Sequence, residues 1–202
     1  MKKIGIEKYL FGIYCAGIII QNILATKTID IMAFTVTAGI LVSPLVFIIQ
    51  DIQSEIFGYK RAKNMILLGY MLSFIATILY VISIKIPGAS EYTAQSSFEI
   101  VLGTTPRIAI ASFIAYVIGS LTNSKVMIEL KNKYDKHLFF RAISSTAIGQ
   151  FFDNALFAVL AFVGILPIGT IITMIIGGTF FEIMYEILFF PITKKLIKAI
   201  NQ

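Results

Sequence analysis

The segment that most constrains this chain is residues 141–164, RAISSTAIGQFFDNALFAVLAFVG, which is long and apolar enough to cross a lipid bilayer. Three polar residues, Gln150, Asp153 and Asn154, lie near its middle. An ionised carboxylate at the centre of a bilayer costs about 2.5–3.5 kcal/mol on insertion scales, so Asp153 must face protein or water rather than lipid. The i, i+3, i+4 spacing puts all three side chains on one face of a helix. The segment therefore predicts a membrane helix with an inward-facing polar patch.

The composition makes lipid the main solvent of the whole chain. Of its 202 residues 57% are hydrophobic and only 14% are charged, and the mean hydropathy is +0.87. A soluble domain of this size cannot bury so much apolar surface. The net charge of +6 would suggest nucleic acid as a partner of a soluble protein. Here the basic residues lie in short segments between apolar runs, so we expect a bilayer and no nucleic acid.

Apolar runs recur along the chain at lengths close to the roughly 20 residues that a helix needs to cross a membrane. The runs are too long and too continuous for the strands of a membrane barrel. The sequence therefore predicts an all-α membrane protein, a six-transmembrane helix bundle that forms one integral domain over residues 1–202. The expected spans are residues 9–26, 31–50, 64–85, 106–121, 140–165 and 168–190.

The distribution of basic residues predicts the orientation of this bundle. Only Lys27, Lys85 and Arg107, of the 17 lysines and arginines, fall outside the segments on the side of the two termini. Because loops rich in lysine and arginine stay in the cytoplasm, we expect both termini to be cytoplasmic. An even number of spans leads to the same conclusion.

The last predicted span carries two more acidic residues, Glu182 and Glu186, one helical turn apart. Neither has a basic residue within a turn, and Glu182 falls near the middle of the span. Intramembrane acidic residues usually mark functional sites, so we expect a polar cavity lined by Asp153 and these glutamates. The alternative is a set of structural hydrogen bonds between helices.

Other polar residues lie at the ends of the predicted spans. Asn22 lies near the outer end of the first span, where its amide can bond another helix or a polar ligand. Arg107 lies at the start of the fourth span, where it either anchors the helix at the interface or faces inward. Asp51 and Glu55 share one helix face at the cytoplasmic end of the second span, just before a basic segment. They are either a solvated helix end or a gate held by ion pairs, for which Lys27 is a further candidate.

No catalytic constellation is visible in the sequence. Asp153 is the one aspartate well inside a span, and the chain has no His/Cys metal-binding spacing, no nucleophile elbow and no phosphate-binding loop. We therefore expect no enzyme activity, no metal and no cofactor.

Five motifs, which fall in five of the six predicted spans or at their ends, occur in the order found in one transporter family. They are Asn22-Ile-Leu-Ala-Thr-Lys27, Asp51-x-x-x-Glu55-x-Phe-Gly58, Arg107-Ile-Ala-Ile-Ala-Ser112-Phe-Ile-Ala-Tyr116, Ser145-Thr146 with Asp153 and Phe157, and Tyr185-Glu186 with Pro191. On these motifs the chain resembles the YhhQ-like family of queuosine-precursor transporters, within the wider vitamin-uptake transporter group. A departure is Glu182, where relatives often have lysine.

The resemblance implies uptake across the inner membrane of 7-cyano-7-deazaguanine, 7-aminomethyl-7-deazaguanine or queuine. A guanine-like edge offers neighbouring N–H and NH₂ donors, which one carboxylate, Asp153 or Glu186, can accept together. The ring carbonyl and ring nitrogens need donors, and an aromatic ring can supply a flat wall. The candidate substrate-binding residues are Asn22, Arg107, Gln150, Asp153, Asn154, Phe157, Glu182 and Glu186.

Two other functions fit the same sequence. The chain can be the substrate-binding subunit of a vitamin transporter that needs a separate ATP-driven energising module, with small residues such as Gly12 and Ala16 as a docking face. It can also be an intramembrane enzyme or a structural membrane protein. A monomer and a homodimer both remain open.

Overall fold

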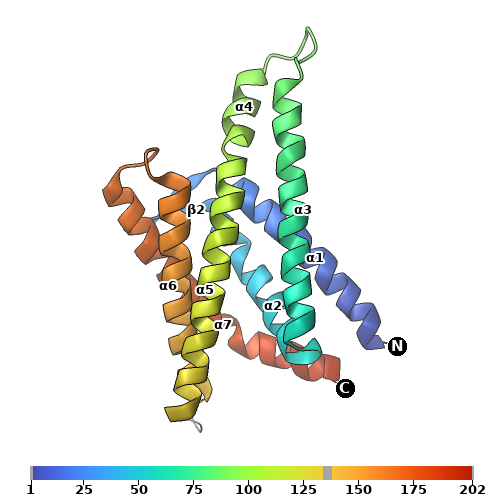
Figure 1. The fold of residues 1–202 in the computed structure, drawn as a ribbon, viewed down its shortest axis with the longest axis vertical. Coiled ribbons are helices and arrows are strands. Elements are labelled where there is room, and N and C mark those ends of the chain that lie inside the picture. The colour runs from blue at the N-terminus through green and yellow to red at the C-terminus, as the bar shows by residue number, and fades with distance from the viewer. Residues whose placement is uncertain (1, 134–137, 202) are drawn as a thin grey trace. The chain divides into compact units, whose positions relative to one another are not determined.

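The computed structural model describes residues 2–133 and 138–201, and it is mainly helical (Figure 1). Two short antiparallel strands follow the first helix, and a single 3-10 turn leads into the second. The elements are α1 (Lys2–Leu24), β1 (Thr28–Ile31), β2 (Phe34–Thr37), η1 (Ala38–Leu41), α2 (Ser43–Phe57), α3 (Tyr59–Lys85), α4 (Gln95–Gly103), α5 (Thr105–Lys133), α6 (Leu138–Phe162) and α7 (Ile168–Asn201).

Four helical stretches are long and apolar enough to cross a membrane, which makes this a multi-pass protein. They are Tyr59–Lys85, Gln95–Asn123, Ile143–Phe162 and Ile168–Ile200. The last four expected spans overlap these stretches. The first expected span lies in α1, whose hydropathy is lowered by Glu7, Lys8, Gln21 and Asn22. The second lies partly in α2, which has only 15 residues.

The expected helix over residues 31–50 is wrong in its first part, because residues 28–37 form a β-hairpin. Thr28 pairs with Thr37, and Ile31 pairs with Phe34. Several of these residues are β-branched, which favours strands over helices. Met32 begins the two-residue turn with φ at 56°, the positive value that such tight turns need at their first position. Helical structure resumes only at residue 38.

The segment between the third and fourth expected spans is more helical than an ordinary loop. The expected spans leave residues 86–105 as a connection, and within it α4 occupies residues 95–103 and leads through Thr104 into α5. At its other end α5 continues to residue 133, well past the predicted end at 121. The membrane-length stretch Gln95–Asn123 is therefore longer than the 16-residue run that hydropathy suggested.

Contacts divide the chain into two compact units. The first comprises residues 1–27, 38–109 and 189–202. Within it α1 packs against α2 and α3, and the contact points are glycines: a Cβ on Gly17 would lie 2.9 Å from Val46, and one on Gly69 would lie 3.0 Å from the Tyr14 ring. Tyr14 itself is fully buried. Gly12 of the expected packing face has no atom within 4 Å of an added Cβ and is exposed.

The second unit comprises residues 28–37 and 110–188. Within it α5 and α6 run side by side (Figure 1) and approach closely at Gly119 and Gly149. A Cβ on Gly119 would lie 2.9 Å from the Gly149 carbonyl oxygen, so the two glycines let the backbones of α5 and α6 approach closely. The hairpin packs on α7, where the Phe34 ring stacks on Phe180 with centroids 6.0 Å apart.

Candidate functional site

One residue of the predicted intramembrane patch, Asn154, joins α6 to the acidic residues of α7. The Asn154 side chain, on α6, donates a hydrogen bond from Nδ2 to Glu182 Oε2 on α7 at 2.5 Å. The same Nδ2 donates to the backbone carbonyl oxygen of Gln150 at 2.9 Å. An amide group has two hydrogens, so both are committed within the protein. Asn154 therefore holds the Glu182 carboxylate in position.

A glycine on α7 makes room for this contact. A Cβ on Gly178 would meet the Asn154 side chain at clash distance. Gly178 lies one turn before Glu182, so the Asn154 amide can lie across the backbone of α7 and reach the carboxylate. Glu182 is buried, with 9% of its surface exposed. Because a buried acidic side chain needs a hydrogen-bond partner, this bond is the main local compensation for burying Glu182.

Asp153 lies beside this pair at the contact between α5 and α6. An added Cβ on Gly119 would lie 2.8 Å from the Asp153 Cβ, so this carboxylate belongs to a tightly packed part of the helix pair. The Asp153 and Glu182 carboxylates are also near enough to interact electrostatically. No ion pair is found for either carboxylate within the described residues. The cluster is therefore acidic and has no basic counterpart in that part of the chain.

The remaining predicted residues of this region line the same helix faces. Gln150 and Phe157 lie one turn on either side of Asp153 and Asn154, and both are half-buried. The Phe157 ring packs edge-on against Phe162, with centroids 5.8 Å apart. Glu186 lies one turn beyond Glu182 and is half-buried. Spacing in the sequence predicted these shared faces correctly.

Two predicted site residues lie in the other unit. Asn22 is buried and donates from Nδ2 to Ser73 Oγ at 2.8 Å, so it joins α1 to α3. Arg107 lies in the first turn of α5 and is exposed. Their predicted contact with a solute remains a prediction.

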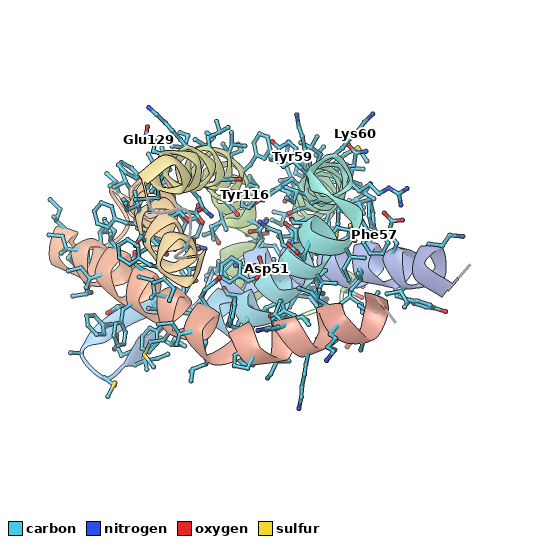
Figure 2. The ribbon with its side chains drawn as sticks, turned by 90° about the horizontal axis from the view of Figure 1, so that it is seen from below. Asp51, Phe57, Tyr59, Lys60, Tyr116 and Glu129 are labelled. Carbon is cyan, nitrogen blue, oxygen red and sulfur yellow. The ribbon has the colours of Figure 1, made fainter. Side chains whose placement is uncertain are left out.

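The predicted gate residues are exposed, and the strongest polar contact near them involves a residue that we did not expect. Asp51, Glu55 and Lys27 are all exposed. Figure 2 shows Lys60 projecting outward from the start of α3. An ion pair in this unit joins Arg61 to Glu7 at 2.8 Å, and Gln53 Nε2 donates to Glu7 at 3.1 Å. Glu7 was missed because only tertiary structure brings α1 beside the start of α3.

Thr179 is a second residue that the sequence analysis missed. Its hydroxyl oxygen is buried and has no hydrogen-bond partner in the part of the chain that the structure describes. It follows Gly177 and Gly178 and precedes Glu182 by one turn. Two glycines and a threonine just before an intramembrane glutamate were the available signal.

Within the described residues, no group of three or more His, Cys, Asp or Glu side chains is close enough to hold a metal ion. Carboxylates, amides and a hydroxyl between apolar membrane helices are suited to holding a polar organic solute by hydrogen bonds. Fold and site together define a multi-pass membrane protein of the transport class.

Comparison with known proteins identifies the family within that class. Residues 37–196 match the family described as putative vitamin uptake transporter, and the chain belongs to this family. It is a transporter of the inner (cytoplasmic) membrane, as the resemblance in the sequence predicted. The match includes α6, α7 as far as residue 196, and every acidic residue of the intramembrane cluster.

Three relatives carry a more specific name. A Bacillus subtilis protein named probable queuosine precursor transporter is 28% identical over 170 residues, which are 82% of this chain and 71% of the relative. A Haemophilus influenzae protein with the same name is 33% identical over 64% of this chain and 53% of its own length. The Escherichia coli queuosine precursor transporter is 26% identical over 70% and 62%. No solved structure matches the chain.

Proposed function

We propose that this protein imports a queuosine precursor, one of 7-cyano-7-deazaguanine, 7-aminomethyl-7-deazaguanine and queuine, and that the acidic cluster between α6 and α7 binds it. The Asn154–Glu182 bond is an interhelical hydrogen bond of the kind that a purely structural role would also give. The observation that carries the proposal is that Asp153 and Glu186, in the same membrane-length helices, have no hydrogen-bond partner among the described residues. The names of the three relatives support the choice of substrate.

The chemistry of a deazaguanine base suits such a cluster. Its N–H and neighbouring NH₂ are donors that one carboxylate accepts together, and Asp153 and Glu186 are the carboxylates that no described hydrogen bond occupies. Glu182 is already held by Asn154. The half-buried Phe157 offers an aromatic face for the ring system.

We further propose six spans with both termini in the cytoplasm. α1 and the η1–α2 segment then supply the first two crossings. Basic residues concentrated on one side support this topology. The α2 helix alone is about 22 Å long at about 1.5 Å per residue, less than the ~30 Å hydrocarbon core. The η1 turn before it therefore has to contribute to the crossing.

The test is uptake of radiolabelled precursor in a bacterial host that lacks its own precursor uptake and any ATP-driven vitamin-transport module. We expect the wild-type chain to transport at least one of the three precursors without a partner. Uptake only after a module is supplied would instead support the substrate-binding-subunit function. Failure of all three precursors to bind would move the protein outside this substrate class.

The Asp153→Asn variant tests the site itself, because it keeps the size of the side chain and removes its charge. We expect about tenfold to hundredfold weaker uptake at equal expression, since hydrogen bonds to a charged group contribute about 1.5–3 kcal/mol. The matched control is Asp30→Asn, which changes an exposed aspartate on the hairpin that bonds only locally to Thr35 at 2.7 Å. Wild-type uptake by the Asp153 variant would refute this assignment.

A further inference from the structure

The hydroxyl of Thr179 differs from those of Thr77 and Thr173, two other threonines in the described helices. Thr77 donates to the Ser73 carbonyl oxygen at 2.9 Å, and Thr173 donates to the Thr170 carbonyl oxygen at 2.8 Å. Such bonds to the preceding turn are the usual way in which an apolar helix satisfies a threonine. Thr179 makes no such bond, although its oxygen is buried.

A buried hydroxyl without a partner is unfavourable and calls for an explanation. The position of Thr179 supplies one. Thr179, Glu182 and Glu186 are spaced i, i+3, i+7 and so share one face of α7. The opposite side of the helix packs on the hairpin, where an added Cβ on Gly177 would lie 2.6 Å from Phe34. Thr179 therefore belongs to the face that carries the acidic cluster.

The side chains of this cluster offer many hydrogen-bond acceptors and few donors that are still available. Asp153, Glu182 and Glu186 are acceptors when ionised. Both N–H groups of the Asn154 amide are already used within the protein. A guanine-like base presents an acceptor, its ring carbonyl, directly beside the N–H and NH₂ donors that a carboxylate would read. The donor for that carbonyl has to come from another side chain of the cluster. The Gln150 amide is one such group, and the Thr179 hydroxyl on α7 is another.

We propose that Thr179 is a specificity-determining residue, whose hydroxyl donates to the ring carbonyl oxygen of the base while a neighbouring carboxylate accepts from the adjacent N–H and NH₂. This inference rests on the proposed function. It makes Thr179 a direct contact of the solute, whereas Asn154 positions Glu182. A hydroxyl that can donate once and accept twice also serves any of the three proposed precursors, because they share this edge.

The test is equilibrium binding to the purified full chain in lipid nanodiscs, with two probes. The first is 7-cyano-7-deazaguanine, and the second is its 6-thio counterpart, in which a weakly accepting sulfur replaces the ring oxygen. Thr179→Val should bind the oxo base about threefold to tenfold more weakly, the effect of losing one hydrogen bond, and should bind the thio base as wild type does. Thr179→Ser keeps the hydroxyl and should retain the preference for oxygen.

The matched control is Thr173→Val on the same helix, whose hydroxyl bonds its own backbone, and it should bind both probes as wild type does. If Thr179→Val folds poorly, Thr179→Ala removes the same hydroxyl with less bulk. Unchanged oxo affinity, or equal weakening for both probes, would overturn the role of Thr179 and leave the proposed function intact. Failure of the wild-type chain to bind either base, or its precursor relatives, would overturn both.

Discussion

At the scale of single residues, the Asn154–Glu182 hydrogen bond decides how an acidic side chain is accommodated inside a membrane helix pair. Glu182 is buried, and the Asn154 amide is its hydrogen-bond donor within the described residues. Removing the donor would leave a buried carboxylate unsatisfied, which is unfavourable. The bond fixes the relative register of α6 and α7 as well as the position of the carboxylate.

A double-mutant cycle should therefore show coupling between these two residues. We expect Asn154→Ala and Glu182→Ala to be coupled by about 0.6–1.7 kcal/mol in the free energy of unfolding, the range found for hydrogen bonds between membrane helices. Denaturant titration in detergent, followed by circular dichroism, provides the measurement. The control pairs Asn154→Ala with Glu186→Ala, for which no described bond exists and near-zero coupling is expected. A zero result for the first pair would show that the bond has no energetic consequence.

At the scale of elements, glycines set how closely the helices approach. Gly119 and Gly149 allow the backbones of α5 and α6 to touch, and this contact positions Asp153 at the crossing. On α7, Gly177 packs against Phe34 of the hairpin, and Gly178 packs against the Asn154 side chain. Two adjacent glycines thus serve two different neighbours because successive residues of a helix point about 100° apart.

Gly119→Ala should destabilise the protein by about 1–3 kcal/mol, because the new methyl group would lie 2.8 Å from the Asp153 Cβ and 2.9 Å from a backbone oxygen. Gly12→Ala is the matched control, since no atom lies within 4 Å of an added Cβ there. Because alanine has a higher helix propensity than glycine, Gly12→Ala should leave the free energy of unfolding unchanged or raise it by up to about 1 kcal/mol. Thermal unfolding of the two variants in one detergent compares them, and equal effects would argue against a tight crossing.

At the scale of the whole molecule, the open question is how the first sixty residues cross the membrane. A hairpin at membrane depth is tolerated only when protein or a water-filled cavity surrounds it. The exposed tip at Met32, 89% exposed, is easier to accommodate at the outer surface. Tyr59, 73% exposed, begins α3 beside the basic segment that we assign to the cytoplasm.

Single cysteines at these two positions should be labelled from opposite sides. In a Cys15→Ser background, a membrane-impermeant maleimide should modify Met32→Cys in intact cells and Tyr59→Cys only after permeabilisation. The original Cys15 is 6% exposed and should resist labelling in the wild-type chain. Labelling of both positions from the same side would show that residues 38–57 do not cross, and would leave fewer than six spans.

The sequence predicted the parts of the site that depend on spacing along one helix. Gln150, Asp153 and Asn154 on one face, and Glu182 and Glu186 on another, followed from helical periodicity and from the cost of charge in lipid. It did not predict the Glu7–Arg61 ion pair or the unsatisfied Thr179 hydroxyl. Those depend on which residues of distant elements meet. The hairpin was missed because hydropathy registers its apolar residues and ignores their strand preference.

By itself the sequence determined that this chain is a membrane protein. It also determined which segments are apolar enough to be membrane helices and that acidic residues lie within them. Each of these follows from local composition, because the free energy of placing a residue in lipid depends mainly on that residue's own polarity. Only the tertiary structure decided that Asn154 bonds Glu182, that glycines set the crossing at Asp153, and that the Thr179 hydroxyl has no partner among the described residues. These depend on the approach of one helix to another, which packing fixes to a fraction of an ångström and local composition leaves open.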